Sequence, residues 1–227
     1  MPNWDVVLKE IKKETDDPGG ESAADKVRTR YLKRLQTRVK RNVIGYYSGF
    51  LSKPHIQGLD LNDEDKNGFM LAVHKLDKQL GLDLFIHTPG GSIAATESLV
   101  DYIRRIFGSD VRAFVPQIAM SAGTMLACSC KEIYMGSHSN LGPVDPSVNG
   151  IQAQAVLAEV ESTYGQMKVE QSRALVWHPI LSRYTPSFVQ LCQWAVERSE
   201  QFVTRTLMEN MLAEIHDDNE REREAKK

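Results

Sequence analysis

Long apolar runs are absent from this chain of 227 residues. A helix that crosses a membrane needs roughly 20 consecutive apolar residues, and no stretch of the sequence approaches that length. The first residues, MPNWDVVLKEIKKE, are amphipathic and lack the charged region followed by an apolar region that marks a secretory signal peptide. We therefore expect a cytoplasmic protein without a membrane span.

Cysteine is scarce, and neither sign of charge is in excess. The spacing of Cys128, Cys130 and Cys192 indicates neither a disulfide framework nor a zinc site, so we expect no bound metal. The 28 Lys and Arg residues nearly balance the 30 Asp and Glu residues, for a formal net charge of −2. Basic residues gather at 22–41, but no aromatic residues alternate with them for base stacking, so we expect no nucleic acid partner.

The composition divides the chain into three segments. Residues 1–41 show two helical patterns and are expected to form an N-terminal helical arm. Residues 42–216 alternate short apolar runs with helical patterns, which predicts an α/β domain with a mostly parallel sheet and a C-terminal helical extension. Residues 217–227, DDNEREREAKK, form a charged tail that is too polar to pack on a core.

The apolar patterns also place the expected strands and helices. Strands are expected at 43–50, 82–87, 111–115 and 132–135. Helices are expected at 62–81, capped by Asn62, at 92–108, 121–130 and 151–168, and from 186 to about 216. Three loops follow three of the strands, and ligands of open α/β sheets lie outside the carboxyl ends of strands. These loops are therefore the first candidates for a site.

The first loop, TPGGS at 88–92, carries two adjacent glycines before an expected helix. The exposed amides of such a turn bind anions, either a phosphate or the oxyanion of an acyl-transfer reaction. No GxGxxG and no Gly-Lys-Ser/Thr is present, so the specific phosphate motifs are missing. A plain turn between strand and helix remains the alternative.

The second loop, AMSAG at 119–123, places Ser121 between small residues at the start of an apolar helix. It keeps the Ser-x-Gly half of the nucleophile elbow, but Ala119 stands where the first glycine would be. Ser121 is a candidate nucleophile, and the N–H of Ala122 could point at the same oxygen as Gly91. The alternative is that Ser121 only caps the helix.

The third loop, SHSNLGPVDPSV at 137–148, is rich in turn-forming residues. It supplies His138 and Asp145, which could act as a base and the carboxylate that orients it. His87 and His178 are weaker candidates for the base. The alternative is a rigid turn, with Asp145 capping the segment that follows it.

In combination, TPGGS, MSAGT and LGPVDP resemble the Clp protease and crotonase superfamily, and most closely its serine dehydrogenase proteinase branch, which is related to signal peptide peptidase A. The resemblance covers about residues 42 to 215 and implies a Clp/crotonase-like spiral of βα units. It also implies that Ser121 is the nucleophile. The oxyanion hole would then be formed by Gly90, Gly91 and Ala122, with the amides of Gly91 and Ala122 as its donors.

The general base is where the sequence departs from part of this superfamily. Val144 stands at the position of the catalytic histidine of the Clp proteolytic subunit, and His138 matches a histidine that is not the base. Relatives of the signal peptide peptidase type use a lysine further along the chain. The first lysine after LGPVDP is Lys168, which we take as the expected base. Asp145 could hold the base, bind a substrate amine or cap the next segment.

The resemblance implies a serine endopeptidase with an acyl-enzyme on Ser121 and no cofactor, acting on peptides or proteins. It also implies a homo-oligomer. The peptidase is expected either to act with an unfoldase or adaptor as a further partner or to act without ATP. Two other functions stay open at this point. One is a crotonase-like enzyme acting on acyl-coenzyme A, and the other is a catalytically degenerate module that binds peptides or supports assembly.

Overall fold

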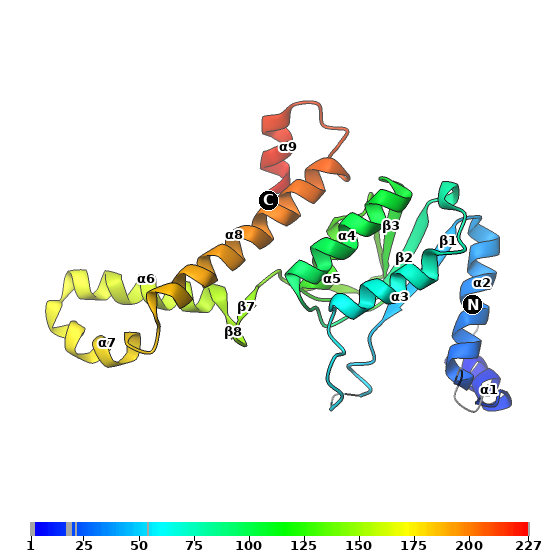
Figure 1. Ribbon diagram of the computed structural model, residues 1–227, viewed down its shortest axis with the longest axis horizontal. Helices are drawn as coiled ribbons and strands as arrows, with labels where there is room; N and C mark the ends of the chain where they lie inside the picture. Colours follow the sequence, from blue (N-terminus) through cyan, green and yellow to red (C-terminus); the bar gives the residue numbers. More distant parts are fainter. Residues whose placement is uncertain (1–2, 17–19, 21, 54, 227) are drawn as a thin grey trace.

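A parallel sheet is the centre of the computed structural model, which describes residues 3–16, 20, 22–53 and 55–226 (Figure 1). Its strands lie in the order β1-β2-β3-β5 and all pair in parallel: β1 (Asn42–Tyr47), β2 (Leu82–His87), β3 (Val111–Val115) and β5 (Glu132–Met135). The apolar run of β2 is buried between two neighbouring strands, as such runs are in parallel sheets. The expected α/β fold with a mostly parallel sheet is confirmed.

Shorter strands lie at the carboxyl end of this sheet. β4 (Ile118–Ala119) pairs in parallel with β6 (Asn140–Leu141), and β7 (Ser147–Val148) forms an antiparallel hairpin with β8 (Ile151–Gln152). These pairs could not be predicted from the sequence, because each strand is only two residues long. They matter because they lie within the loops that carry the candidate site.

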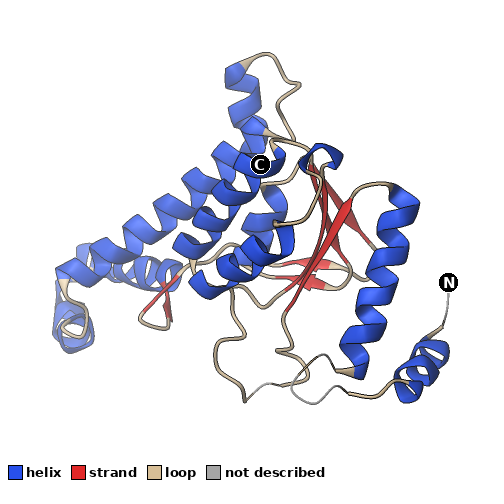
Figure 2. Ribbon diagram, turned by 45° about the vertical axis from the view of Figure 1, so that its right-hand side comes forward, coloured by secondary structure: helices blue, strands red, loops and turns tan. Residues whose placement is uncertain are grey.

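Helices α3 (Asp63–Val73), α4 (Ile93–Phe107) and α5 (Ala122–Cys128) cover one face of the sheet (Figure 2). The side chain of Ser92 begins α4 by accepting a hydrogen bond from the N–H of Ala95. The main core lies between these helices and the sheet, and its fully buried members include Leu82, Leu84, Ile86, Leu99, Val100, Val115, Met125 and Leu126. This core fixes the start of α4 and α5 above the ends of their strands.

The expected helix at 62–81 is wrong in its second half. α3 ends at Val73, and a separate 3-10 turn, η1 (Lys78–Leu80), follows it. The Asp77 side chain caps this turn, and the buried Asn42 amide donates to the carbonyl oxygens of Asp77 and Gly81 at 2.6 and 2.7 Å. These bonds to a distant residue hold the chain in a turn that its helical periodicity does not reveal.

On the other face lies α2 (Ala23–Val39), and α1 (Trp4–Lys13) packs on α2 rather than on the sheet. α2 packs over β1 at Gly45, where a side-chain carbon would lie only 3.5 Å from Leu32 Cδ1. Beside it, Phe85, Phe114 and Tyr134 share one register row, with stacked rings whose centroids are 4.9 and 4.7 Å apart. The sheet is therefore lined by aliphatic residues on one face and by aromatic rings on the other.

A helical extension, residues 153–209, first runs away from the sheet and then returns to it along its last helix, whose Phe202 lies in the main core (Figure 1). It contains α6 (Ala153–Val169), the 3-10 turn η2 (Gln171–Arg173), α7 (Ala174–Leu181) and α8 (Pro186–Glu209). α6 and the first half of α8 lie side by side over a second, small core of Ala153, Val156 and Cys192. None of the helices in the described ranges combines the length and the apolar character that a membrane span requires.

The carboxyl-terminal residues differ from expectation in two places. α8 ends at Glu209 rather than near 216. The side-chain amide of Asn210, the next residue, donates to the carbonyl oxygens of Ser129 at 2.8 Å and Thr206 at 3.0 Å. The charged tail, which was expected to be too polar to pack on a core, forms the helix α9 (Asp218–Ala225) and contacts α8. Its polar residues remain exposed while Ala225 is buried.

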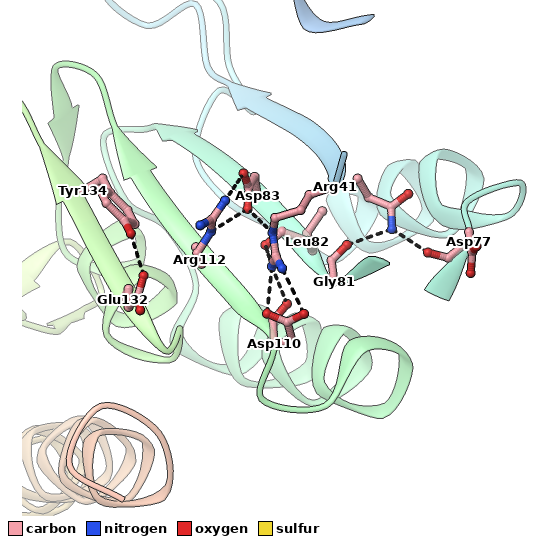
Figure 3. Close-up of polar contacts among 10 residues, drawn as sticks. Arg41, Asp77, Gly81, Leu82, Asp83, Asp110, Arg112, Glu132 and Tyr134 are labelled. Atoms are coloured by element: carbon pink, nitrogen blue, oxygen red, sulfur yellow. Dashed lines mark hydrogen bonds and ion pairs between the residues drawn. The ribbon is translucent and has the colours of Figure 1, made fainter. Parts of the chain in front are cut away.

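An ion-pair network lies at the amino end of the sheet (Figure 3). Asp83, whose side chain is 2% exposed, accepts hydrogen bonds from Arg41 Nε at 2.7 Å and from Arg112 Nη2 at 2.6 Å. Arg41 also binds the more exposed Asp110, and this bond holds the pKa of the Asp110 carboxyl below its usual value. The network ties the segment between α2 and β1 to the two central strands.

His87, the last residue of β2, lies at the opposite end of the sheet. Its ring stacks on Tyr47 and Phe50, with centroid distances of 4.8 and 5.3 Å. It is 3% exposed, and its Nε2 has no hydrogen-bond partner among the described residues. Burial lowers the pKa of His87 below its ordinary 6.5, because the charged imidazolium is poorly solvated there.

Asp83→Asn should lower the free energy of unfolding by about 3 kcal/mol, because it leaves two arginines without their shared buried carboxylate. Asp110→Asn is the matched control. Its carboxylate binds the same Arg41 but is 52% exposed, so the expected loss is below about 1 kcal/mol. Urea unfolding of both variants at neutral pH measures the difference, and equal losses would contradict the assignment.

The stability of the protein should fall as the pH drops below 6.5, the ordinary pKa of histidine. Below that pH the unfolded chain takes up a proton at His87, whereas the folded chain does so only at a lower pH. The contribution of His87 to the free energy of unfolding is therefore complete above pH 6.5 and is lost as the pH falls through the lower folded pKa. The change is at most about 1.4 kcal/mol per pH unit. His87→Phe keeps an aromatic ring and cannot take a proton, so urea unfolding at pH 7.5 and 5.5 should differ less for this variant. An unchanged pH dependence in His87→Phe would assign the effect to other groups.

Candidate active site

The three loops predicted to carry the site are joined by backbone hydrogen bonds through β4. On one side of β4, the N–H of Met120 donates to the carbonyl oxygen of Thr88 at 3.1 Å. On the other side, the N–H of Gly142 donates to the carbonyl oxygen of Ala119 at 2.9 Å. Loops that are far apart in sequence therefore form one surface at the carboxyl ends of the strands.

Ser121 stands at the turn between β4 and α5 in a backbone conformation that few residues other than glycine adopt, with φ 48° and ψ −109°. Its side chain makes no capping hydrogen bond to the helix, although a serine at this position commonly does. The residue is half-buried. The turn thus leaves the hydroxyl group without a hydrogen bond to the helix backbone, at some cost in backbone strain.

The turn at Gly90 approaches Ser121 closely. A side-chain carbon on Gly90 would lie 3.0 Å from Ser121 Cβ and 3.6 Å from the backbone nitrogen of Ala122. Gly90 also has a φ of 111°, which residues with a side chain rarely adopt. Both the space and the backbone conformation therefore require glycine here, and they bring the first loop against the second.

Gly91 is held by the segment before α3. The N–H of Leu61 donates to the carbonyl oxygen of Gly90 at 2.7 Å, and the N–H of Ser92 donates to the carbonyl oxygen of Leu61 at 2.8 Å. The N–H groups of Gly91 and Ala122 have no acceptor among the described residues. Two backbone donors next to Ser121 are thus free to bind an oxygen atom of a ligand.

Ser121 and Gly91 line the same cleft, which has a volume of about 710 Å³. Its walls come from the TPGGS loop and the start of α4, from the turn at 145–148 and from α8. The lining residues are Pro89, Gly91, Ser92, Ile93, Ala94, Ser121, Asp145, Pro146, Ser147, Val148, Leu191, Trp194, Ala195 and Arg198. A peptide segment could therefore lie against Ser121 between the sheet and α8.

Asp145 belongs to this cleft, whereas the candidate bases do not. His138 is exposed on the loop after β5, and His178 is exposed on α7. His87 stacks on aromatic rings as described above. Lys168 is in the last turn of α6, with its Nζ 4.4 Å from the centre of the Tyr164 ring. Of the predicted site residues, the structure brings together Ser121, both glycines, Ala122 and Asp145.

The direction of α6 explains the position of Lys168. α6 begins beside the cleft, where the N–H of Ala153 donates to the carbonyl oxygen of Pro146 at 2.8 Å. It then runs away from the sheet (Figure 1). Fifteen residues at 1.5 Å each place Lys168 about 22 Å along the helix from Ala153. Within one chain, its amine is therefore remote from Ser121.

Two contributions to the site were missed in the sequence. The buried Thr124 hydroxyl lies 2.7 Å from the carbonyl oxygen of Gly142 and 3.0 Å from that of Ala119, so it holds the second loop to the third. Thr124 lies three residues after Ser121 on the expected helix, and this spacing could have indicated that the two side chains are neighbours. Leu61 holds the glycine turn through its backbone alone, and backbone contacts leave no signal in residue identity.

Comparison with known proteins agrees with this architecture. The chain matches the ClpP-like SDH-type serine proteinase family over residues 21–183, which include all three loops. Two proteins of Methanocaldococcus jannaschii are similar to it. Uncharacterized protein MJ0137 is 34% identical over 98 residues, or 43% of this chain and 34% of that protein. Uncharacterized protein MJ1495 is 26% identical over 144 residues, or 63% of this chain and 44% of that protein.

The alignments thus span less than half the length of these two relatives. The family match covers most of the chain, and it confirms the resemblance found in the motifs TPGGS, MSAGT and LGPVDP. With the parallel sheet and the three joined loops, it shows that this chain belongs to the ClpP-like SDH-type serine proteinase family.

Proposed function

We propose that the protein is a serine endopeptidase whose nucleophile is Ser121. The Ser121 oxygen attacks the carbonyl carbon of a peptide bond, and a base takes the hydroxyl proton. The N–H groups of Gly91 and Ala122 bind the oxyanion of the tetrahedral intermediate. The carbon–nitrogen bond then breaks, the amine leaves with the proton, and water hydrolyses the resulting ester on Ser121.

One observation carries this proposal: an uncapped serine hydroxyl lies in a cleft beside two backbone N–H groups that have no acceptor among the described residues. Buried or half-buried backbone donors are normally paired. Leaving two of them free next to a strained serine is the arrangement that acyl transfer needs. The close approach of Gly90 to Ser121 keeps these groups together.

Ser121→Ala should abolish both peptide hydrolysis and covalent labelling by a fluorophosphonate probe, because the acyl-enzyme cannot form. A loss of at least about a thousandfold in rate is expected for a nucleophile. Ser137→Ala, an exposed serine on the loop after β5, is the control and should keep both activities. Labelling that persists in Ser121→Ala would refute the assignment, and peptide binding without turnover in the unchanged protein would favour a degenerate binding module.

We further propose that the base is Lys168 from a neighbouring copy in a homo-oligomer. The helical extension carries Lys168 away from its own cleft, and it exposes large apolar side chains that a second copy could cover. Val169 and Leu175 are the most exposed of these, at 90% and 84%. Docking in the cleft would also remove water from the amine, and this desolvation favours the neutral form that a base requires.

Mixing two inactive variants tests whether Lys168 acts between copies. Lys168→Arg keeps the positive charge beside Tyr164 but cannot accept a proton, so it should be inactive alone, as Ser121→Ala should be. Equal mixtures, after exchange of subunits, should regain about a quarter of the activity, because one pairing in four joins an intact Ser121 to an intact Lys168.

The control for this mixture combines Ser121→Ala with the double variant that also carries Lys168→Arg, and it should stay inactive. A mixture without activity would place the base in the same chain. Full activity of Lys168→Arg alone would exclude Lys168 as the base.

The substrate of this proposed enzyme is a peptide or an unfolded protein segment, because the cleft has to admit an extended chain. An unfoldase or adaptor partner, or action without ATP, both fit such a role. The three free cysteines fit the reducing conditions of a cytoplasm. The reaction as proposed uses backbone amides and side chains alone.

A further inference from the structure

Asp145 is the one acidic residue, within the part of the chain that the structure describes, that lines the cleft of Ser121 and Gly91. Its Oδ1 atom is buried and has no hydrogen-bond partner among the described residues. Burying an unpaired carboxylate oxygen is unfavourable, so such groups are usually paired or serve a ligand. The structure therefore leaves a charged acceptor without a partner within the proposed active site.

Capping does not account for this carboxylate. The segment after Asp145 is held instead by backbone contacts, since the carbonyl oxygen of Pro146 accepts from Ala153 and β7 pairs with β8. Pro143 and Pro146 restrict the backbone on both sides of Asp145. The turn thus holds the backbone of Asp145 at the cleft, and no hydrogen bond of the turn among the described residues uses its side chain.

The other charge on the cleft is already neutralised. Arg198 of α8 binds Glu97 through its Nη2 at 2.6 Å and its Nε at 3.0 Å. No other lysine, arginine or histidine lines this cleft among the described residues. Among the described residues, the cleft therefore offers no unpaired cation to the carboxylate of Asp145, so a cationic group of a ligand could pair with it.

The side chains that line the cleft indicate which kind of cation fits. Apolar side chains line it around Asp145, from the turn and from α4 and α8, including Ile93, Val148, Leu191 and Trp194. Lysine and arginine have long aliphatic stems that pack on apolar surfaces and a charged end that binds carboxylates. A substrate side chain of this type would cover the apolar wall and reach the carboxylate.

A role in positioning the base is less consistent with the chemistry. A carboxylate beside a lysine amine stabilises the protonated form, which opposes the action of lysine as a base. A carboxylate does orient a histidine base, but no histidine lines this cleft among the described residues. The substrate is therefore the better partner for Asp145.

We propose that Asp145 is a specificity-determining residue that binds a lysine or arginine side chain of the substrate close to the peptide bond attacked by Ser121. This inference rests on the proposed peptidase function for the position of the scissile bond. The binding of the cation itself does not require catalysis, so the two proposals can fail separately.

The test uses the Ser121→Ala protein, which binds peptides without cleaving them, and two fluorescent peptides that differ only in lysine or norleucine at one position. Norleucine keeps the aliphatic stem and lacks the charge. We expect the lysine peptide to bind about ten- to a hundredfold more tightly by fluorescence anisotropy. Adding Asp145→Asn should remove this preference and leave the affinity for the norleucine peptide unchanged.

Asp101→Asn, on the exposed face of α4, is the matched control because it changes the net charge equally without touching the cleft. It should keep the preference for lysine. Equal affinity for the two peptides before any change at Asp145 would overturn the inference. So would an equal loss for both peptides in Asp145→Asn, which would indicate a structural role.

A further measurement does not depend on the folding of an Asp145 variant. In the unchanged protein, the lysine peptide should protect Ser121 from the fluorophosphonate probe at about ten- to a hundredfold lower concentration than the norleucine peptide. Equal protection by both peptides would overturn the role of Asp145 while leaving the nucleophile in place. A preference for lysine in binding, without any labelling or hydrolysis, would instead refute the peptidase and keep the cation site.

Discussion

The contact between Gly90 and the turn at Ser121 is the constraint on which the site depends. A side chain on Gly90 would press on both the serine and the backbone ahead of α5, so the two loops can meet only because glycine is present. The meeting is then fixed from three directions: by Leu61 behind the glycines, by Thr88 alongside β4, and by Thr124 beneath the turn. A rigid position for two free amides follows from contacts that involve almost no side-chain chemistry.

Much of this arrangement could be predicted because the sheet is parallel. Continuous apolar runs such as LDLFIH mark buried strands, and the loops after neighbouring parallel strands must open at the same edge. TPGGS and AMSAG were therefore placed together from sequence. The two helix ends that were predicted wrongly are set by contacts with residues distant in sequence. Asn42 ends the helical pattern after α3, and Asn210 ends α8 by binding the end of α5, and neither contact has a local pattern.

The base could not be placed from sequence because its position depends on the direction of one helix. The spacing between Ser121 and Lys168 is compatible with an amine that folds back over the cleft. The bond from Ala153 to Pro146 and the packing of α6 on α8 send the helix outward instead. The helix carries Lys168 about 22 Å along its axis from Ala153, so the position of the amine depends on the direction that the chain takes at this turn. Lys168 as the base thus stays a prediction that requires a second copy.

Two carboxylates at opposite ends of the sheet, the buried Asp83 and the half-buried Asp145, show how the same group can serve structure or binding. Asp83 lies between two arginines, which donate to both of its oxygens, and its charge is fully used within the fold. Asp145 is held in place by prolines and backbone bonds, and its Oδ1 receives no donor from the described residues. Folding stability alone would select against such an unpaired group. Asp83 has two arginine partners within the fold and Asp145 has none in the part of the chain that the structure describes, and this difference supports a role for Asp145 in binding a ligand.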